Sequence, residues 1–411
     1  IKRLASGENI DYHYATVRKF AMLRQYKSAG FDITELYDES KEETSQRNKL
    51  DAMTLRDIDE YFESKRLAIK HDFISTENIE HYKAGDDFEY TKETFKETPR
   101  LGLSFQSPYL NDVYRGIMGL TLRSGGSGSG KTTLSIGDAC MSGVKYYYDL
   151  EQKKYVTNHS YIGNVLFINT EMDLREELDI MFIAWISGVS RQHIMDGAYH
   201  GDEEERVDKA YQILSESGIY VVDDPEFTAK NLEEIIEDYI VDKSVKLVVF
   251  DYVQNQGYVA NELAEESGIP MREDMVLLTL TDRLKQLSRK YNVPILTGTQ
   301  LNGQEFNMPY PTEACLAGGK SQVRKADCSM IIMPLSQKNM EEIEPYLNVL
   351  GDKPKPNLVV HSIKGRASRF PKYIKIYQHV DLGTGRSMDL FATYKDLDPL
   401  NDIESLHIHH F

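Results

Sequence analysis

The residues with the clearest chemical potential lie in one glycine-rich stretch, residues 125–133. The stretch reads Gly125, Gly126, Ser127, Gly128, Ser129, Gly130, Lys131, Thr132 and Thr133, which matches G-x-x-x-x-G-K-[ST] at every fixed position. Glycines let backbone N–H groups point inward around anionic oxygens, so this pattern is typical of phosphate-binding loops. We expect Lys131 to reach the β- and γ-phosphates of a nucleotide and the Thr132 hydroxyl to hold Mg²⁺.

The residues on either side favour this interpretation over a flexible Gly/Ser linker, which composition alone would allow. Residues 117–122 before the loop are mostly apolar and predict a strand that ends there. Residues 134–139 after it predict the start of a helix, whose N-terminal dipole would favour bound phosphate.

Polar side chains also follow other predicted strands. Asp251 ends an apolar run at 247–250, Glu171 follows a strand at 165–169, and Gln300 follows a strand at 295–299. Parallel sheets bind ligands at the carboxyl ends of their strands. There Asp251 could join the Mg²⁺ shell, Glu171 could polarise the attacking water, and Gln300 could sense a γ-phosphate.

Each of these side chains also has a plainer interpretation. Asp251 could be a solvated strand-end acid, and Gln300 an ordinary loop residue. Glu171 could simply cap a helix predicted at 173–186 through the helix dipole. The phosphate-loop pattern upstream favours the catalytic interpretation.

Basic residues cluster in two later segments. Residues 316–325 form a basic, glycine-containing stretch, interpreted as a flexible loop, in which Gly318, Gly319, Lys320 and Arg324 could contact a nucleic-acid backbone. An ordinary surface loop is the alternative. Lys364 and Arg366 follow a predicted strand, and an arginine there could stabilise charge on a transferring phosphoryl group across a subunit boundary.

The order of predicted elements indicates an α/β fold. Helices are predicted at 12–30 and 55–70, and the polar residues 76–99 read as a linker. From residue 101 onward strands alternate with helices, which is typical of a parallel sheet covered by helices. The predicted strands lie at 120–123, 165–169, 219–222, 247–250, 295–299, 330–333 and 357–362, with hairpins at 146–156 and 377–390.

Composition sets broad limits on function. The chain has 411 residues, 41% of them hydrophobic, and a net charge of −17, which argues against a surface that coats nucleic acid non-specifically. A local basic lining, such as a ring pore, remains compatible with that charge. The three cysteines form no C-x-x-C pattern and suit a reducing cytoplasm, where we expect the protein. No apolar run approaches the length of a membrane span, so no membrane partner is expected.

Taken together and in order, these pieces resemble the DnaB-type replicative DNA helicases, hexameric enzymes with a RecA-like ATPase motor. The similarity runs from residue 101 to about residue 390. It includes the phosphate loop and the runs Asn169-Thr170-Glu171-Met172, Phe250-Asp251-Tyr252-Val253-Gln254, Thr299-Gln300-Leu301-Asn302 and Lys364-x-Arg366. Residues 14–32 look like the linker helix of this family, which docks on the adjacent subunit.

The resemblance implies a domain division and a set of roles. It divides the chain into a helical linker region (1–75), a flexible linker (76–100) and a RecA-like ATPase domain (101–411). ATP and Mg²⁺ would be held by residues 125–133 and Asp251, with Glu171 as base and Gln300 as γ-phosphate sensor. Lys364 and Arg366 would act on a neighbour's nucleotide. Single-stranded DNA would pass through the pore of a homo-hexamer, and a primase and a helicase loader would be partners.

The sequence departs from the family in two places. The arginine–acid pair usual in the DNA-binding loop is replaced by Ala317-Gly318-Gly319-Lys320, and the segment 257–272 is long and acidic. Such divergence suits a phage or mobile-element enzyme. Family members carry a helical N-terminal domain before the linker helix. This sequence begins at Ile1 rather than Met, so whether a further N-terminal part precedes it stays open.

Two other functions stay open at the level of sequence. One is a RecA-like recombinase, a DNA-dependent ATPase that forms filaments. The linker-like helix and Lys364-x-Arg366 argue against it. The other is a non-motor scaffold held together by nucleotide, against which Glu171 argues, since a scaffold needs no base.

Overall fold

The chain forms two compact units in the computed structural model, Ile1–Glu97 and Thr98–Phe411, which we call the helical unit and the sheet unit. The structure describes residues 7–38, 40–41, 44–73, 83, 85, 88, 92, 101–254, 257–303, 310–318, 320–368, 370 and 373–410. Most of the predicted linker at 76–100 lies outside the described residues, as does Gly319.

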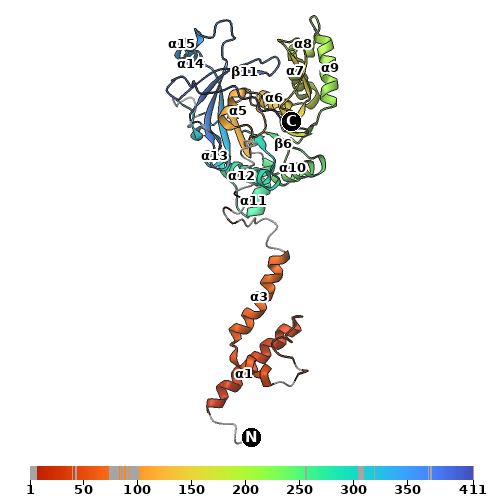
Figure 1. Cartoon of the computed structure of the whole chain (residues 1–411), viewed down its shortest axis with the longest axis vertical. Helices are drawn as coiled ribbons and strands as arrows, with labels where there is room; N and C mark the ends of the chain where they lie inside the picture. Colours follow the sequence, from red (N-terminus) through yellow and green to blue (C-terminus); the bar gives the residue numbers. More distant parts are fainter. Residues whose placement is uncertain are drawn as a thin grey trace. The chain divides into compact units, whose positions relative to one another are not determined.

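The helical unit has a small hydrophobic core of its own. Its helices are α1 (Gly7–Ser28), α2 (Thr44–Ala52) and α3 (Leu55–Phe73) (Figure 1). The core consists of Leu23, Ile33, Leu36, Leu50, Ile58 and Phe62. The buried Lys19 ammonium ties α1 to the end of α2 by donating to the carbonyls of Leu50 and Asp51, at 3.0 and 2.9 Å. Sequence periodicity missed α2 because Leu50 is its only large apolar residue.

The sheet unit alternates strands and helices along most of its length. Its strands are β1 (Leu120–Gly125), β2 (Tyr146–Asp149), β3 (Lys154–Thr157), β4 (Val165–Asn169), β5 (Ile219–Asp223), β6 (Leu247–Asp251), β7 (Ile295–Thr297), β8 (Cys328–Pro334), β9 (Leu358–Gly365), β10 (Lys375–Val380) and β11 (Ser387–Thr393). Its α-helices are α5 (Pro108–Tyr114), α6 (Lys131–Gly143), α7 (Asp179–Ser187), α8 (Arg191–Asp196), α9 (Glu203–Ser215), α10 (Ala229–Lys243), α11 (Gly257–Ser267), α12 (Glu273–Tyr291), α13 (Lys320–Lys325), α14 (Gln337–Glu342) and α15 (Glu344–Leu347). A π-helical turn, η1 (Leu174–Leu178), precedes α7, and a 3₁₀ turn, η3 (Glu313–Cys315), precedes α13.

The main sheet has nine strands in the order β11-β10-β9-β8-β1-β7-β6-β4-β5. The strands from β5 to β8 in this order are parallel, and β9, β10 and β11 continue the sheet as an antiparallel meander. The mostly parallel sheet confirms the RecA-like α/β prediction. Because β1, β7, β6 and β4 are parallel, the segments that follow them all emerge at one edge of the sheet.

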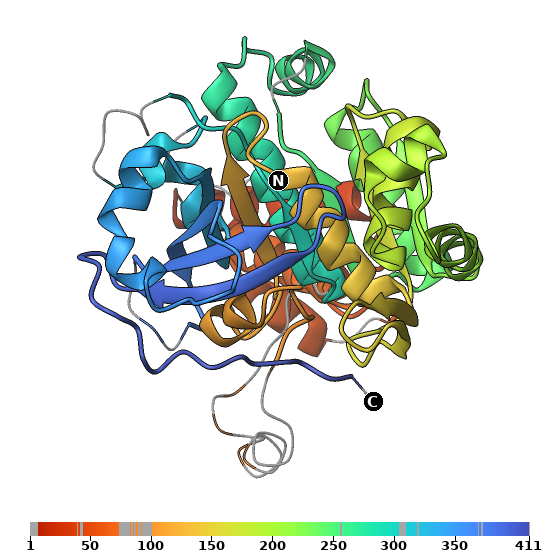
Figure 2. The ribbon, with the colours of Figure 1, turned by 90° about the horizontal axis from the view of Figure 1, so that it is seen from above.

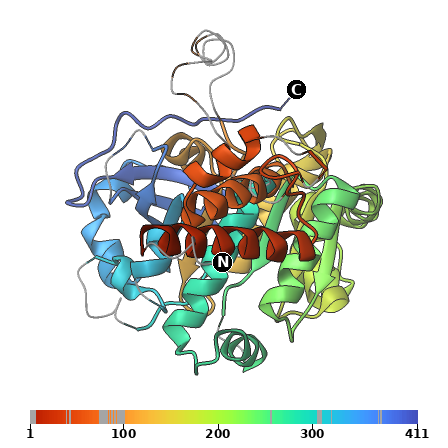
Figure 3. The same ribbon diagram turned by 90° about the horizontal axis from the view of Figure 1, so that it is seen from below.

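Helices cover both faces of this sheet. Phe167, Val249 and Leu296 point into one core, with α6 and α7 above them. The alternate residues Ile168 and Phe250 point into the other, which α10, α11 and α12 cover (Figure 3). The alternation follows from the period of two along a strand, and burial on both faces explains why the strands are continuously apolar.

Two local features differ from the sequence-based expectation. The segment 316–325 was expected to be a flexible loop, but Lys320–Lys325 forms the helix α13. Val323 on this helix is buried in a hydrophobic cluster with Ile331 and Ile363, which stabilises it. The helix expected at 173–186 begins with the π-helical turn η1. In the described part of the chain, no helix is long and apolar enough to cross a membrane.

The turn between β10 and β11 reaches back to the helix that follows the glycine loop (Figure 2). A Cβ built on Gly385 in this turn would lie 3.3 Å from the Thr133 side chain. The half-buried Arg386 donates to the carbonyls of Trp185 and Ile186 at the end of α7. Residues far apart in sequence therefore surround the start of α6.

Candidate nucleotide-binding site

The glycine loop leaves the carboxyl end of β1 and enters α6 through two left-handed glycines. Gly128 and Gly130 have φ of 68° and 92°, which residues with a Cβ adopt only at a cost. Gly125 is required for space, since a Cβ there would lie 2.3 Å from the Ser129 hydroxyl oxygen. No side chain caps α6 at Gly130, so its first-turn N–H groups remain available to an anion.

Lys131 is held in the centre of the loop. Its ammonium donates to the carbonyls of Gly125 and Gly126, both at 3.0 Å, and the residue is only 8% exposed. Burial lowers the pKa of Lys131, and the nearby carboxylates of Asp251 and Glu171 oppose that shift. A desolvated cation at a helix N-terminus is suited to bind phosphate oxygens.

Thr132 and Asp251 meet although they are far apart in sequence. The Thr132 hydroxyl donates to the Asp251 carboxylate at 2.5 Å. Burial raises the pKa of Asp251, while the hydrogen bond from Thr132 and the charge of Lys131 oppose the rise. One hydroxyl and one carboxylate are the hard oxygen donors that Mg²⁺ takes from a protein when nucleotide phosphates supply the rest, so this pair fits Mg²⁺.

Glu171 and Gln300 are joined by a residue to which the sequence analysis assigned no role. The Tyr252 hydroxyl donates to Glu171 Oε1 at 3.0 Å, and Gln300 Nε2 donates to the same hydroxyl. The Lys131 ammonium lies 5.2 Å from the centre of the Tyr252 ring. The only sequence signal for Tyr252 was its position directly after Asp251.

The alternative of Glu171 as a helix cap receives no support from these contacts. Asp173 caps the turn η1, because its carboxylate accepts from the backbone N–H groups of Arg175 and Glu176 at 2.9 and 2.7 Å. Glu171 instead is exposed and bonded to Tyr252 at the sheet edge. The Glu171 carboxylate therefore does not cap this turn, and it is accessible to water.

Lys364 and Arg366 lie at the other edge of the sheet. Arg366 pairs with Asp327 at 3.1 Å, and Asp327 also accepts from the backbone N–H of Leu120, where β1 begins. The glycine loop follows the other end of β1, and 6 residues of strand span roughly 17 Å. The structure thus separates Lys364 and Arg366 from the loop of their own chain.

The predicted nucleic-acid residues lie next to Lys364. Lys320 and Arg324 are exposed on α13, and Gly318 before it has a φ of 74°. The Lys364 ammonium donates to the carbonyls of Val323 and Arg324, both at 2.8 Å, and so caps the end of α13. Burial lowers the pKa of Lys364, and the charge of Arg366 adds to this.

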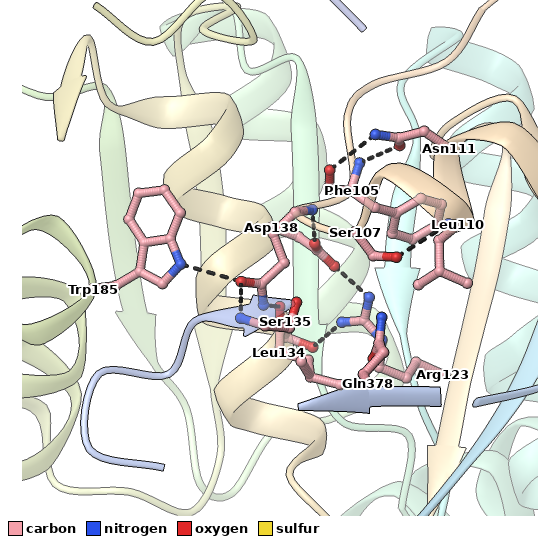
Figure 4. A network of polar contacts seen from close by, with 12 residues as sticks. Phe105, Ser107, Leu110, Asn111, Arg123, Leu134, Ser135, Asp138, Trp185 and Gln378 are labelled. Atoms are coloured by element: carbon pink, nitrogen blue, oxygen red, sulfur yellow. Dashed lines mark hydrogen bonds and ion pairs between the residues drawn. The ribbon is translucent and has the colours of Figure 1, made fainter. Parts of the chain in front are cut away.

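A buried ion pair joins the strand before the loop to the helix after it (Figure 4). The Arg123 guanidinium on β1 pairs with the Asp138 carboxylate on α6, and their side chains are 2% and 0% exposed. Asp138 also accepts from the backbone N–H of Gln106 at 2.7 Å, and the Gln106 amide accepts from the Trp185 indole at 3.3 Å. The pair therefore fixes both ends of the loop and connects them to α7.

The fold and this loop define a P-loop nucleoside-triphosphate-binding protein with a RecA-like sheet. Residues 108–342 match the family model described as the DnaB-like helicase C terminal domain. The chain belongs to this family, as the resemblance predicted.

The chain is also similar to individual known proteins. The SPbeta prophage-derived uncharacterized protein YorI of Bacillus subtilis (strain 168) is 34% identical over 423 residues, covering 99% of this chain and 82% of YorI. That relative is consistent with a phage-encoded origin. Two solved structures show the same fold at 13% identity. One, described as an ATPase domain, has a TM-score of 0.57 and covers 76% of this chain and 100% of its own. The other is a DnaB-like replicative helicase described with its primase interactions. It has a TM-score of 0.56 and covers 84% of this chain and 79% of its own.

The Arg123–Asp138 pair generates a stability prediction. Arg123→Met should lower the free energy of unfolding of the sheet unit by about 3–5 kcal/mol, because it leaves Asp138 buried without its counter-charge. The double variant Arg123→Met/Asp138→Leu should recover most of that loss. Urea unfolding followed by fluorescence reports on this unit, since Trp185 is the only tryptophan of the chain.

Lys290→Ala provides the control, because it removes an exposed ion pair with Glu237 and should cost less than about 1 kcal/mol. A single Arg123→Met variant as stable as this control would contradict the role of the buried pair.

Proposed function

We propose that the protein is an ATP-dependent replicative DNA helicase, whose hexameric ring moves along single-stranded DNA and hydrolyses ATP between subunits. One observation carries the proposal. The proposed site residues come from four separate segments and lie close together at one edge of the sheet. They are Lys131 with Thr132, Glu171, Asp251 and Gln300. Family membership supports the helicase assignment of this ATPase-like site.

Each side chain has a role that its surroundings support. Lys131 binds and orients the β- and γ-phosphates from its desolvated position. Thr132 and Asp251 hold Mg²⁺, which when bound neutralises charge on the phosphate oxygens. Glu171, exposed and anchored through one carboxylate oxygen, orients the attacking water with the other and takes its proton. Gln300 senses the γ-phosphate through its amide.

The position of Arg366 supports action on a neighbouring subunit. It lies at the edge of the sheet away from its own loop, and its side chain is 56% exposed. A guanidinium there can stabilise charge on the neighbour's transferring phosphoryl group. Lys364 shares this edge, but its ammonium is partly buried against α13, so Arg366 is the better placed of the two.

We assign DNA contact to the segment 318–324. Lys320 and Arg324 are exposed cations that can bind backbone phosphates. Such a local basic lining is compatible with a net charge of −17 for the whole chain. The replicative-helicase neighbour is described with primase, and we propose a primase and a loader as partners here.

The α1 helix offers a surface for ring assembly. Ile10, Tyr14 and Val17 follow one another at helical spacing and are 60%, 65% and 61% exposed. Exposed apolar stripes of this kind are typical of protein interfaces. We propose that this stripe docks on the adjacent subunit, as the linker helix does in the family.

Activity assays test the proposal directly. The wild-type protein should hydrolyse ATP, be stimulated by single-stranded DNA, unwind a forked duplex, and form rings in particle images. Lys131→Ala should abolish turnover. Glu171→Gln should still bind ATP but hydrolyse it about 10²–10⁴-fold more slowly, as expected for loss of a general base.

Three results would contradict parts of this assignment. Filaments without unwinding would favour a recombinase. Rings that bind nucleotide without turnover would favour a scaffold, and normal turnover by Glu171→Gln would remove Glu171 from the chemistry.

Mixed rings test action between subunits. Arg366→Ala and Lys131→Ala subunits should each be inactive alone, but mixing them should restore some hydrolysis. At a mixed interface an intact loop can face an intact arginine. Hydrolysis is measured against mixing ratio, with ring formation checked in parallel. Intact mixed rings without any restored turnover would count against the proposal.

Charge placed on the α1 stripe tests assembly. Tyr14→Asp/Val17→Asp should shift the particle mass from hexamer to smaller species, because a carboxylate cannot be buried unpaired at an interface. Mass photometry with ATP measures this. Arg47→Ala/Asn48→Asp on α2 makes the same change in net charge on exposed residues away from the stripe and should leave the mass unchanged. Equal masses for both double variants would contradict docking through this stripe.

A further inference from the structure

Tyr252 is the point at which the predicted catalytic side chains are joined. It is 6% exposed, and its ring lies against the Lys131 ammonium. Its hydroxyl contacts Glu171 on one side and Gln300 on the other. Among the described residues, these two hydrogen bonds through Tyr252 are the only ones that link Glu171 to Gln300.

The two hydrogen bonds have a defined direction. The Gln300 amide N–H can only donate, so the hydroxyl oxygen accepts from it and its single proton points to Glu171. The Gln300 amide has two N–H donors, so it can hold Tyr252 with one and present the other to a phosphate oxygen.

Gln300 is also bonded to the segment that leads to α13. Its carbonyl accepts from the backbone N–H of Ala317 at 2.9 Å, and Asn302 donates its own N–H to Cys315 at 2.8 Å. Leu301 and Leu316 form an antiparallel bridge between these two bonds. Lys320, the first residue of α13, follows Ala317 by three positions. Hydrogen bonds therefore connect Glu171, through Tyr252 and Gln300, to Ala317.

We propose that Tyr252 is a positioning residue that couples the Glu171 carboxylate to Gln300 and, through the 300–302 and 315–317 pairing, to occupancy of α13 by single-stranded DNA. The inference rests on the proposed function and extends it to the regulation of the same site. DNA bound at α13 displaces the paired segments, Gln300 moves with them, and the hydroxyl reorients Glu171 toward the water. Without the hydroxyl, Glu171 loses the contact that transmits this movement.

Tyr252→Phe tests the coupling, because it keeps the ring beside Lys131 and removes only the hydroxyl. We expect a KM for ATP close to that of the wild type, with the stimulation of kcat by an oligo(dT) strand reduced about tenfold, the value of one hydrogen bond of ordinary strength. Binding of a fluorescent ATP analogue and thermal unfolding report whether the site and the fold are intact.

Tyr155→Phe is the matched control. It also removes a tyrosine hydroxyl from the sheet unit, but this hydroxyl donates to the backbone carbonyl of Arg206 on α9, which is not a residue of the candidate site. This variant should keep wild-type DNA stimulation.

A double-mutant cycle with Gln300→Ala separates coupling from independent effects. If Tyr252 acts through Gln300, then Tyr252→Phe/Gln300→Ala should lose no more DNA stimulation than Gln300→Ala alone. Multiplicative losses, or undiminished stimulation in Tyr252→Phe, would overturn the coupling while leaving the helicase assignment standing. A wild-type protein without DNA-stimulated hydrolysis would instead overturn the proposed function, and the coupling with it.

Discussion

The buried Lys131 ammonium places a strong constraint on the residues around the glycine loop. Removing Lys131 from water is costly, so the structure surrounds it with two loop carbonyls, two carboxylates and an aromatic ring. The loop carbonyls belong to Gly125 and Gly126. The carboxylates require β4 and β6 to end on the same side of the sheet as β1. Much of the architecture around the loop can be understood as the surroundings that stabilise one desolvated cation.

The same constraint explains the rigid support beneath the loop. Arg123 and Asp138 fix the strand and the helix on either side, so the backbone N–H groups of the loop keep their directions. Gln106 and Trp185 extend this network to α7, which begins shortly after Glu171. The buried pair thus connects the strand and the helix on either side of the glycine loop to Trp185 on α7.

The opposite edge of the sheet combines two other proposed roles. Asp327 pairs with Arg366 and Lys285, and Lys364 caps the helix that carries Lys320 and Arg324. A cation proposed to reach a neighbour's nucleotide is therefore adjacent to residues proposed to bind DNA. Hydrolysis between subunits and DNA contact would then share a small cluster of charges, as a ring motor requires.

Local patterns were enough to predict the glycine loop, the strand-end residues Asp251, Glu171 and Gln300, and most strands, because buried parallel strands are short apolar runs that end in polar residues. The family match confirmed the resemblance drawn from their order. Folding of the chain decided what no local pattern contains: the strand order, the contact of Thr132 with Asp251, the distance of Arg366 from its own loop, and the central position of Tyr252. These depend on contacts between residues tens to hundreds of positions apart, which only tertiary packing brings together.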